Sequence, residues 1–114
     1  GTGLPLRVMK GQAYVINFFA SWCAPCLAEV PLLDELRRTH GIPVIGVAWK
    51  DTPEGLTRML AKTNPYSKVL VDENGEAMLA IGATGVPETL VVDANGIIRE
   101  RIRSNLQPED IAQR

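Results

Sequence analysis

Apolar stretches along the chain alternate with helical patterns, and this order predicts an α/β sheet. Residues 13–19 and 43–49 are almost entirely apolar, as expected for strands that are buried on both faces. Residues 24–39 between them predict one helix, because apolar side chains recur there at helical spacing. This stripe consists of Leu27, Val30, Leu33 and Leu36. A strand–helix–strand unit with a single crossover joins parallel neighbours, so we expect the two strands to pair in parallel.

Shorter elements fill the second half of the chain. In chain order they are a helix from Thr52-Pro53 to Asn64-Pro65, a strand over 68–71, a helical turn over 76–81, strands over 87–92 and 97–103, and a helix that begins at 107. Asn95-Gly96 between the last two strands is typical of a hairpin turn. Pro31 is expected to kink the first helix, and Gly41 to end it. We therefore expect a mixed sheet flanked by helices, with an antiparallel hairpin near the C-terminus.

Composition narrows the class of protein but does not change this fold. The 114 residues suffice for one domain, which we assign to 1–114, and 46% of them are hydrophobic and 22% charged. Disorder is excluded by these values. The net charge of −1 offers no basic field for nucleic acid or anionic lipid. No apolar run reaches the roughly 20 residues of a membrane span. The chain contains only two cysteines, which excludes a scaffold held together by several disulfides.

Those two cysteines carry the chemistry. Trp22-Cys23-Ala24-Pro25-Cys26 lies between the end of a predicted strand and the start of a predicted helix. Cys23 falls at the helix N-terminus, where backbone N–H groups stabilise a thiolate and lower its pKa. Cys26 lies one turn into the helix and should be shielded. We expect Cys23 to attack a substrate disulfide and Cys26 to resolve the mixed disulfide. Pro25 would stiffen the loop, and Trp22 would provide apolar surface beside the thiols.

Three other interpretations of the pair are open. It could be half of a zinc site, for which His40 is the remaining candidate ligand, although zinc needs four ligands. It could be two buried cysteines that act as small hydrophobic residues. It could also be a structural disulfide, although so short a loop gains little stability from closure. The position at a strand–helix junction, with a tryptophan before it, favours redox chemistry without metal or organic cofactor.

The stretch from 19 to 26, Phe-Ala-Ser-Trp-Cys-Ala-Pro-Cys, resembles the active site of the thioredoxin superfamily. A thioredoxin-like fold is therefore implied. A second match is Gly-Val-Pro-Glu-Thr at 85–89, where the superfamily carries a cis-proline beside the cysteines. The resemblance implies that Val86-Pro87 is a cis bond, against the alternative of an ordinary trans proline. It also implies that Pro87 and the Val86 backbone bind a partner's extended segment as an added strand.

Further motifs resemble the cytochrome c maturation reductases of the CcmG/DsbE type. They are 85–89, Gly-Val-Ala-Trp-Lys-Asp at 46–51 with Asn-Pro-Tyr at 64–66, and Asp-Ala-Asn-Gly-Ile-Ile-Arg at 93–99. This resemblance covers about 13–109. It implies a periplasmic monomer that reduces apocytochrome c or its maturation partners, with electrons from a membrane thiol transporter. The family's N-terminal membrane anchor is expected to be absent from this chain.

Two glutamates are candidates for supporting roles. Asn17 stands where thioredoxins carry a buried, titratable aspartate, and an amide cannot be that base. Glu29, three residues after Cys26, is then the candidate to move the proton of the buried thiol; the alternative is a solvated glutamate on the helix surface. Glu88 could tune Cys26 or bind a partner; the alternative is an exposed glutamate at a strand end.

Other residues and functions remain as alternatives. Arg99, Arg101 and Arg103 alternate along one strand face, which favours a solvated, edge-protecting surface over a docking patch. Trp49 is expected to pack on the sheet. The rival functions are a TlpA/ResA-like reductase with another client protein, an oxidase that makes disulfides, and a non-catalytic binding domain on the same fold.

Overall fold

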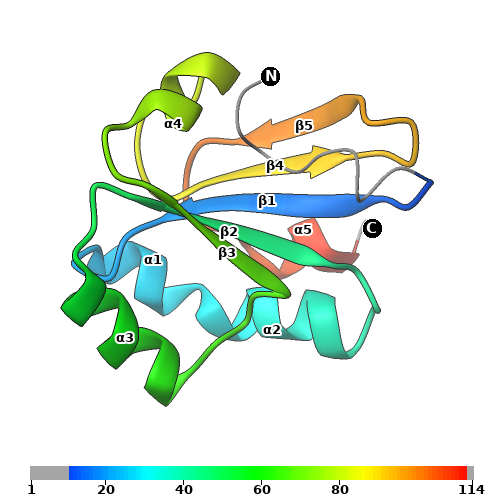
Figure 1. The fold of residues 1–114 in the computed structure, drawn as a ribbon. Coiled ribbons are helices and arrows are strands. Elements are labelled where there is room, and N and C mark those ends of the chain that lie inside the picture. Colours follow the sequence, from blue (N-terminus) through cyan, green and yellow to red (C-terminus); the bar gives the residue numbers. More distant parts are fainter. Residues whose placement is uncertain (1–10, 113–114) are drawn as a thin grey trace.

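A five-stranded mixed sheet forms the centre of the computed structural model, which describes residues 11–112 (Figure 1). The strands are β1 Tyr14–Phe19, β2 Val44–Trp49, β3 Lys68–Asp72, β4 Glu88–Val92 and β5 Ile98–Ile102. Their order in the sheet is β3-β2-β1-β4-β5. β2 pairs in parallel with β1 and β3, whereas β4 runs antiparallel to both β1 and β5. The predicted mixed sheet and C-terminal hairpin are confirmed.

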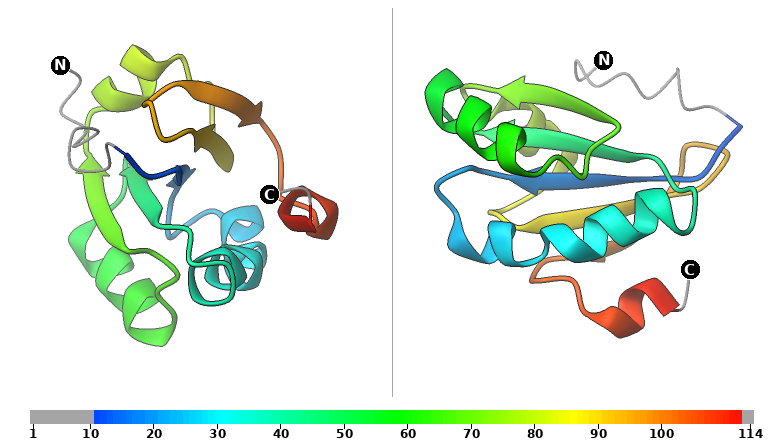
Figure 2. Two further views of the ribbon diagram at one scale, coloured as in Figure 1. Left: turned by 90° about the vertical axis from the view of Figure 1, so that its right-hand side faces the viewer. Right: turned by 90° about the horizontal axis from the view of Figure 1, so that it is seen from below.

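Helices cover both faces of this sheet. They are α1 Ala24–Ala28, α2 Val30–Arg38, α3 Pro53–Lys62, α4 Glu76–Ile81 and α5 Pro108–Ala112. α1, α2 and α3 lie on one face, with α5 beside α2, and α4 lies on the other face (Figures 1 and 2). Within residues 11–112, no helix has the length and apolar character needed to cross a membrane.

The single helix expected over 24–39 is in fact two helices. Glu29 separates them with a non-helical backbone, at φ −94° and ψ 0°. Pro31 lies in the first turn of α2, where its missing N–H costs no hydrogen bond. The predicted kink is therefore a complete break. Leu27 was wrongly placed in the buried stripe, since it precedes the break and is 41% exposed, whereas Leu33 and Leu36 are buried.

The core has one layer on each side of β1. Val15 and Phe19 face α1, α2 and α3, while Ile16 and Phe18 face α4. All six residues of β1 are buried, because β1 is the middle strand and is covered by helices on both faces. The loop that follows β1 leads directly to Cys23, so the cysteine pair is attached to the most deeply buried strand.

The start of α3 follows from the residues that predicted it. Thr52 precedes Pro53, and its side-chain oxygen accepts a hydrogen bond from the Gly55 N–H at 3.0 Å. This contact satisfies one backbone donor that the first helical turn leaves free.

Candidate active site

Cys23 and Cys26 are joined as a disulfide at the start of α1, with their Cα atoms 5.3 Å apart. Cys23 is the N-cap residue of α1, and its Sγ accepts a hydrogen bond from the Cys26 N–H at 3.2 Å. Negative charge on Cys23 Sγ would therefore be stabilised by a helix-terminal donor. Cys23 is 5% exposed and Cys26 is 1% exposed, so an incoming sulfur reaches Cys23 first. Ala24 and Pro25 between them are exposed in the first turn of α1.

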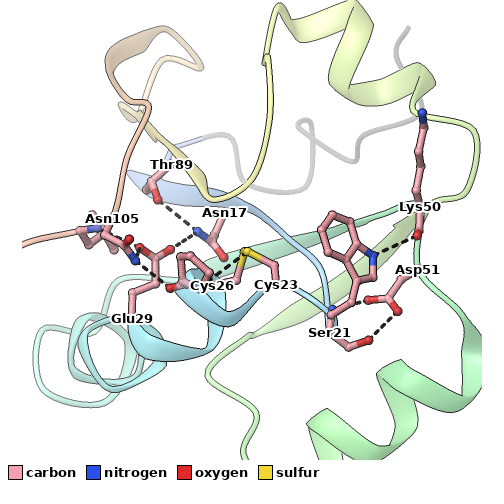
Figure 3. The surroundings of a disulfide bond; sticks show 12 residues. Asn17, Ser21, Cys23, Cys26, Glu29, Lys50, Asp51, Thr89 and Asn105 are labelled. Atoms are coloured by element: carbon pink, nitrogen blue, oxygen red, sulfur yellow. Dashed lines mark hydrogen bonds between the residues drawn. A yellow bond between two sulfur atoms is a disulfide. The ribbon is translucent and has the colours of Figure 1, made fainter.

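A buried carboxylate lies at the C-terminal end of α1. Glu29 is only 2% exposed, so the alternative of a solvated surface glutamate is wrong. Its Oε1 accepts from Asn17 Nδ2 at 2.9 Å, and its Oε2 accepts from the Leu106 N–H at 2.8 Å and from Asn105 Nδ2 at 3.3 Å. Asn105 also donates to the Pro25 carbonyl at 2.7 Å, which ties this network to the cysteine loop. In Figure 3 the disulfide, Asn17 and Glu29 lie in one cluster.

Burial is the main influence on the ionisation of Glu29. Loss of water around the carboxylate raises its pKa, and the hydrogen bonds from Leu106, Asn17 and Asn105 lower it by less. The net result is a carboxyl whose pKa is above its ordinary value. Tyr66 is also affected, because burial first and the Glu29 charge second raise the pKa of its hydroxyl. Tyr66 therefore keeps its proton and acts as a hydrogen-bond donor.

Asn17 is the centre of this network. It is fully buried, and its Nδ2 also donates to Thr89 Oγ1 at 3.1 Å. Its Oδ1 accepts from the Tyr66 hydroxyl at 2.9 Å. The Tyr66 ring stacks on Phe19 with centroids 4.5 Å apart. The ring also covers Gly46, where a Cβ would lie 2.7 Å from a ring carbon, so only glycine leaves room for Tyr66 to reach Asn17.

Glu88 lies on the other face of the sheet. In the β1–β4 register, Thr89 pairs with Asn17 and Glu88 pairs with Phe18, and neighbouring side chains of a strand point to opposite faces. Thr89 therefore faces the cysteine side and Glu88 faces the α4 side. This position does not support a role for Glu88 beside the thiols. The alternative of an exposed strand-end residue is wrong, because Glu88 is 1% exposed.

Two arginines of the β5 region pair with Glu88. Its carboxylate lies 3.6 Å from an Nη of Arg101 and 3.4 Å from an Nη of Arg103, and it accepts from the Thr84 N–H at 3.2 Å. Arg101 donates to the Ile81 carbonyl at 2.6 Å, and Arg103 donates to Thr84 Oγ1 at 3.1 Å. The interpretation of a merely solvated arginine face therefore needs correction. These two arginines tie β5 to the segment between α4 and β4.

Arg99 differs from the other two arginines, since it is outward and exposed and bonds to Asp93 in the hairpin turn. The proline loop precedes β4. The Val86–Pro87 peptide bond is cis, as the sequence resemblance implied. Pro87 is buried, and Val86 is partly buried and packs against both core layers.

The opposite side of the cysteine loop is held by Asp51. Its carboxylate accepts from the Ser21 N–H at 2.5 Å and from Ser21 Oγ at 2.6 Å (Figure 3). Trp22 is 59% exposed, and its Nε1 donates to the Lys50 carbonyl at 3.2 Å. Its ring lies 5.9 Å from that of Trp49, which packs on the α4 side of the sheet as expected. Trp22 thus provides a fixed apolar surface directly before Cys23.

Comparison with known sequences identifies the family. The sequence model of the redoxin family matches residues 2–113. The chain belongs to the redoxin family. It is 42% identical over 95 residues to the thiol:disulfide interchange protein DsbE of Allochromatium vinosum, which covers 82% of this chain and 52% of that relative. It is 42% identical over 105 residues to the thiol:disulfide interchange protein HelX of Rhodobacter capsulatus, covering 91% of this chain and 59% of that relative. This redoxin therefore spans about half the length of the curated relatives it matches.

Solved structures share the fold of this redoxin. The structure of MTB DsbF in its mixed oxidised and reduced forms aligns with a TM-score of 0.83 at 23% identity, over 94% of this chain and 81% of that one. A thiol:disulfide interchange protein of the thioredoxin family from Chlorobium tepidum TLS aligns with a TM-score of 0.80 at 27% identity, over 94% and 79% of the two chains. The thioredoxin-like fold is confirmed.

Sequence reasoning about this redoxin missed four members of the buried network. They are Tyr66, Thr89, Asn105 and the backbone N–H of Leu106. Tyr66 and Thr89 were parts of motifs but carried no role, and the contacts of Thr89, Asn105 and Leu106 depend on strand register and chain path. His40, the other candidate zinc ligand, lies beside Glu35 at 3.6 Å, and among residues 11–112 no group of three His, Cys, Asp or Glu side chains is placed to hold a metal ion.

Proposed function

We propose that this redoxin is a thiol–disulfide oxidoreductase that acts as a reductase on partner proteins. The observation that carries the proposal is the Cys23–Cys26 disulfide at the start of α1, beside the buried carboxylate of Glu29. The names of the relatives, thiol:disulfide interchange proteins, support the same chemistry. A structural disulfide would need neither the helix-terminal donor nor the buried carboxylate.

The reaction begins with the reduced pair. The Cys23 thiolate attacks one sulfur of the partner's disulfide, forming a mixed disulfide and releasing the partner's other sulfur as a thiolate. The Cys26 thiolate then attacks Cys23 Sγ, which forms the Cys23–Cys26 disulfide and releases the second partner thiolate. Two electrons pass from the cysteine pair to the partner. The structure holds the oxidised form, which an external dithiol must reduce before the next cycle.

Glu29 is the group that would take the proton of Cys26. The Cys26 thiol must be deprotonated before it can resolve the mixed disulfide. Glu29 belongs to the next turn after Cys26, and burial raises the pKa of its carboxyl, which narrows the gap to a thiol pKa. Asn17 and Leu106 fix both carboxylate oxygens. Glu88 has no part in this step, because it faces the other side of the sheet.

The proline loop would hold the partner. Val86 and Pro87 immediately precede β4, and the backbone of Val86 would pair with an extended segment of the partner. Arg101 and Arg103 would support this role indirectly, because they tie the preceding segment to β5.

The finer proposal concerns the substrate. We infer that the partner is apocytochrome c or one of its maturation factors, in the periplasm, with electrons from a membrane thiol transporter and with the protein tethered to the membrane. The motifs at 46–51, 64–66, 85–89 and 93–99 support this inference, since they resemble cytochrome c maturation reductases. The relatives named DsbE, HelX and CycY are in keeping with it.

A trapping experiment tests both levels. Cys26→Ser should accumulate a mixed disulfide on Cys23 in the native compartment, and the matched Cys23→Ser variant should accumulate none. Recovery of apocytochrome c or its maturation factors would support the finer proposal. Recovery of unrelated proteins alone would point to a TlpA/ResA-like client range. A non-catalytic binding domain would show itself if Cys23→Ala left cellular function unchanged, and a strongly oxidising potential of the pair would favour a disulfide-making oxidase.

A further inference from the structure

A groove lies on the side of Cys23 that faces α3. It has a volume of about 570 Å³, which is within the range of ligand-binding clefts. Its walls come from the loop before α1, from α1 and from α3. The residues that matter for its chemistry are Ser21, Trp22, Leu27, Arg58, Met59 and Lys62. The groove is distinct from the proline loop, because neither Val86 nor Pro87 lines it.

The groove presents apolar surface beside the reactive cysteine. Trp22 and Leu27 are 59% and 41% exposed, and Met59 forms part of the lining from α3. Trp22 is fixed by its bond to the Lys50 carbonyl, so this surface is in place before a partner arrives.

Two cations line the α3 side of the groove. Arg58 and Lys62 are four residues apart on α3 and therefore share one face. Both are exposed, and neither forms an ion pair with any residue in 11–112. Asp51 also lines the groove, but its oxygens are engaged by Ser21 and by the Thr52 N–H at 2.7 Å. The groove thus offers two free positive groups and one hydrogen-bonded carboxylate.

We propose that this groove binds an acidic, extended segment that flanks the reactive cysteine of the partner protein. An apolar side chain of that segment would lie against Trp22 and Leu27, and carboxylates next to it would pair with Arg58 and Lys62. Such a segment would be held close to the groove, because Trp22, which lines it, directly precedes Cys23, the site of the mixed disulfide. Charge complementarity identifies the occupant, since exposed cations without partners select carboxylates.

This inference rests on the proposed function and adds selectivity among partner proteins. The proline loop would bind the backbone of the partner and so accept many sequences, whereas the groove would recognise the partner's side chains. Recognition here is separate from the sulfur chemistry, so loss of the groove should change which partners react and leave the reactivity of Cys23 intact.

Model peptides test the proposal with the reduced protein. Each peptide carries one cysteine in a mixed disulfide with an aromatic thiol whose release is measured by absorbance. One series places Leu-Glu-Glu at increasing distances on either side of the cysteine, and a second series replaces the glutamates by glutamine. At low salt we expect kcat/KM for the best acidic peptide to exceed that of its glutamine match about three- to tenfold. The ratio should fall as salt screens the charges.

Three variants locate the effect. Arg58→Glu/Lys62→Glu should abolish or reverse the preference for glutamate. Arg38→Glu/Lys68→Glu changes the net charge equally at exposed positions outside the groove and should retain the preference. Leu27→Ser should reduce kcat/KM for peptides with leucine and leave those with serine at that position unchanged. Equal loss of the preference in both charge-reversal variants would overturn the proposal.

The outcomes separate this inference from the function on which it depends. A small uncharged aromatic disulfide cannot fill the groove, and the Arg38→Glu/Lys68→Glu control should reduce it at the wild-type rate. If wild-type protein fails with the small disulfide, the proposed function is wrong. If it succeeds there but treats the glutamate and glutamine peptides alike at every spacing, the groove proposal is wrong. Sedimentation gives a further check, because a dimer that dissociates on Arg58→Glu/Lys62→Glu would make a second copy the occupant and refute the acidic segment.

Discussion

The amide of Asn17 separates this site from one with two buried carboxylates, and Asn17→Asp tests how much that amide contributes. Asn17 Nδ2 lies 2.9 Å from Glu29 Oε1, and the Tyr66 hydroxyl fixes the orientation of the amide by donating to its other end. In the variant a carboxyl oxygen would replace Nδ2. Two carboxyl oxygens would then face each other at hydrogen-bond distance, with both residues almost completely buried.

The size of the destabilisation depends on whether both carboxyl groups of the variant are ionised or share one proton. With both groups ionised, charges 2.9 Å apart repel by about 6 kcal/mol at an effective dielectric constant of about 20. A pair that holds one proton has a lower free energy than the doubly ionised pair. Keeping a carboxyl with an ordinary pKa of about 4.3 protonated at about pH 7 costs about 3.7 kcal/mol. Wild-type protein already bears part of this cost, because burial raises the pKa of Glu29, so we expect Asn17→Asp to lower the free energy of unfolding by at most about 4 kcal/mol at about pH 7.

The sign of the pH dependence distinguishes this explanation from loss of packing. The shared proton has a folded-state pKa above its unfolded value, so its stabilising effect is complete at low pH and is lost as pH rises. The variant should lose about 1.4 kcal/mol for each pH unit above about pH 4, and its deficit relative to wild type should grow once the pH exceeds the raised pKa of Glu29 in wild-type protein. Urea unfolding of the oxidised protein across this range measures it. A deficit that does not change with pH would refute the reasoning.

The matched control exchanges the two side-chain types. In Asn17→Asp/Glu29→Gln the amide sits on position 29 and can donate to the carboxylate at 17, while its oxygen still accepts from the Leu106 N–H. We expect this double variant to recover most of the stability at about pH 7, relative to Asn17→Asp alone. If the exchange recovers nothing, the shared-proton explanation is wrong, and the loss lies in the contacts with Thr89 and Tyr66.

Three other predictions follow from contacts in the fold and the site. Glu29→Gln should remove a decline in stability that wild-type protein shows as pH rises through the raised pKa of Glu29; parallel urea titrations over pH would contradict this. Gly46→Ala should cost about 3 kcal/mol, because its Cβ would meet the rings of Tyr66 and Phe19 at 2.7–2.9 Å, and an unchanged Tm would count against this packing. Thr52→Ala should cost about 1 kcal/mol by removing the N-cap of α3, with Thr52→Ser as the variant expected to retain stability.

Much of the fold could be predicted because the hydrophobic pattern of each strand matches the burial of that strand in the sheet. The continuous apolar character of 13–19 and 43–49 fits only strands covered on both faces, and Asn95-Gly96 fits a hairpin turn. The break at Glu29 was harder to predict. Pro31 is compatible both with a kinked helix and with the first turn of a new one, and the sequence alone does not choose between them.

The assignment of side chains to the two faces of the sheet decides which contacts Glu88 can make. Glu88 and Thr89 are adjacent, and a register shift of one residue exchanges the faces they occupy. In the β1–β4 pairing Thr89 lies opposite Asn17. Glu88 therefore points to the other face, where it pairs with Arg101 and Arg103. Glu29 shows the opposite case. It lies three residues after Cys26 as predicted, but its burial depends on a contact with Leu106, 77 residues away, which no local pattern records.

That distant contact has a consequence for how the chain is made. Cys23 and Cys26 are synthesised in the first quarter of the sequence, whereas the backbone donor to Glu29 Oε2 comes from Leu106. A growing chain that has emerged only as far as β3 carries both sulfur atoms but lacks Thr89, Asn105 and Leu106. The dithiol is therefore present, without its buried carboxylate fully bonded, until synthesis has passed Leu106. A product truncated before residue 106 would be a thiol protein with an incompletely bonded proton acceptor.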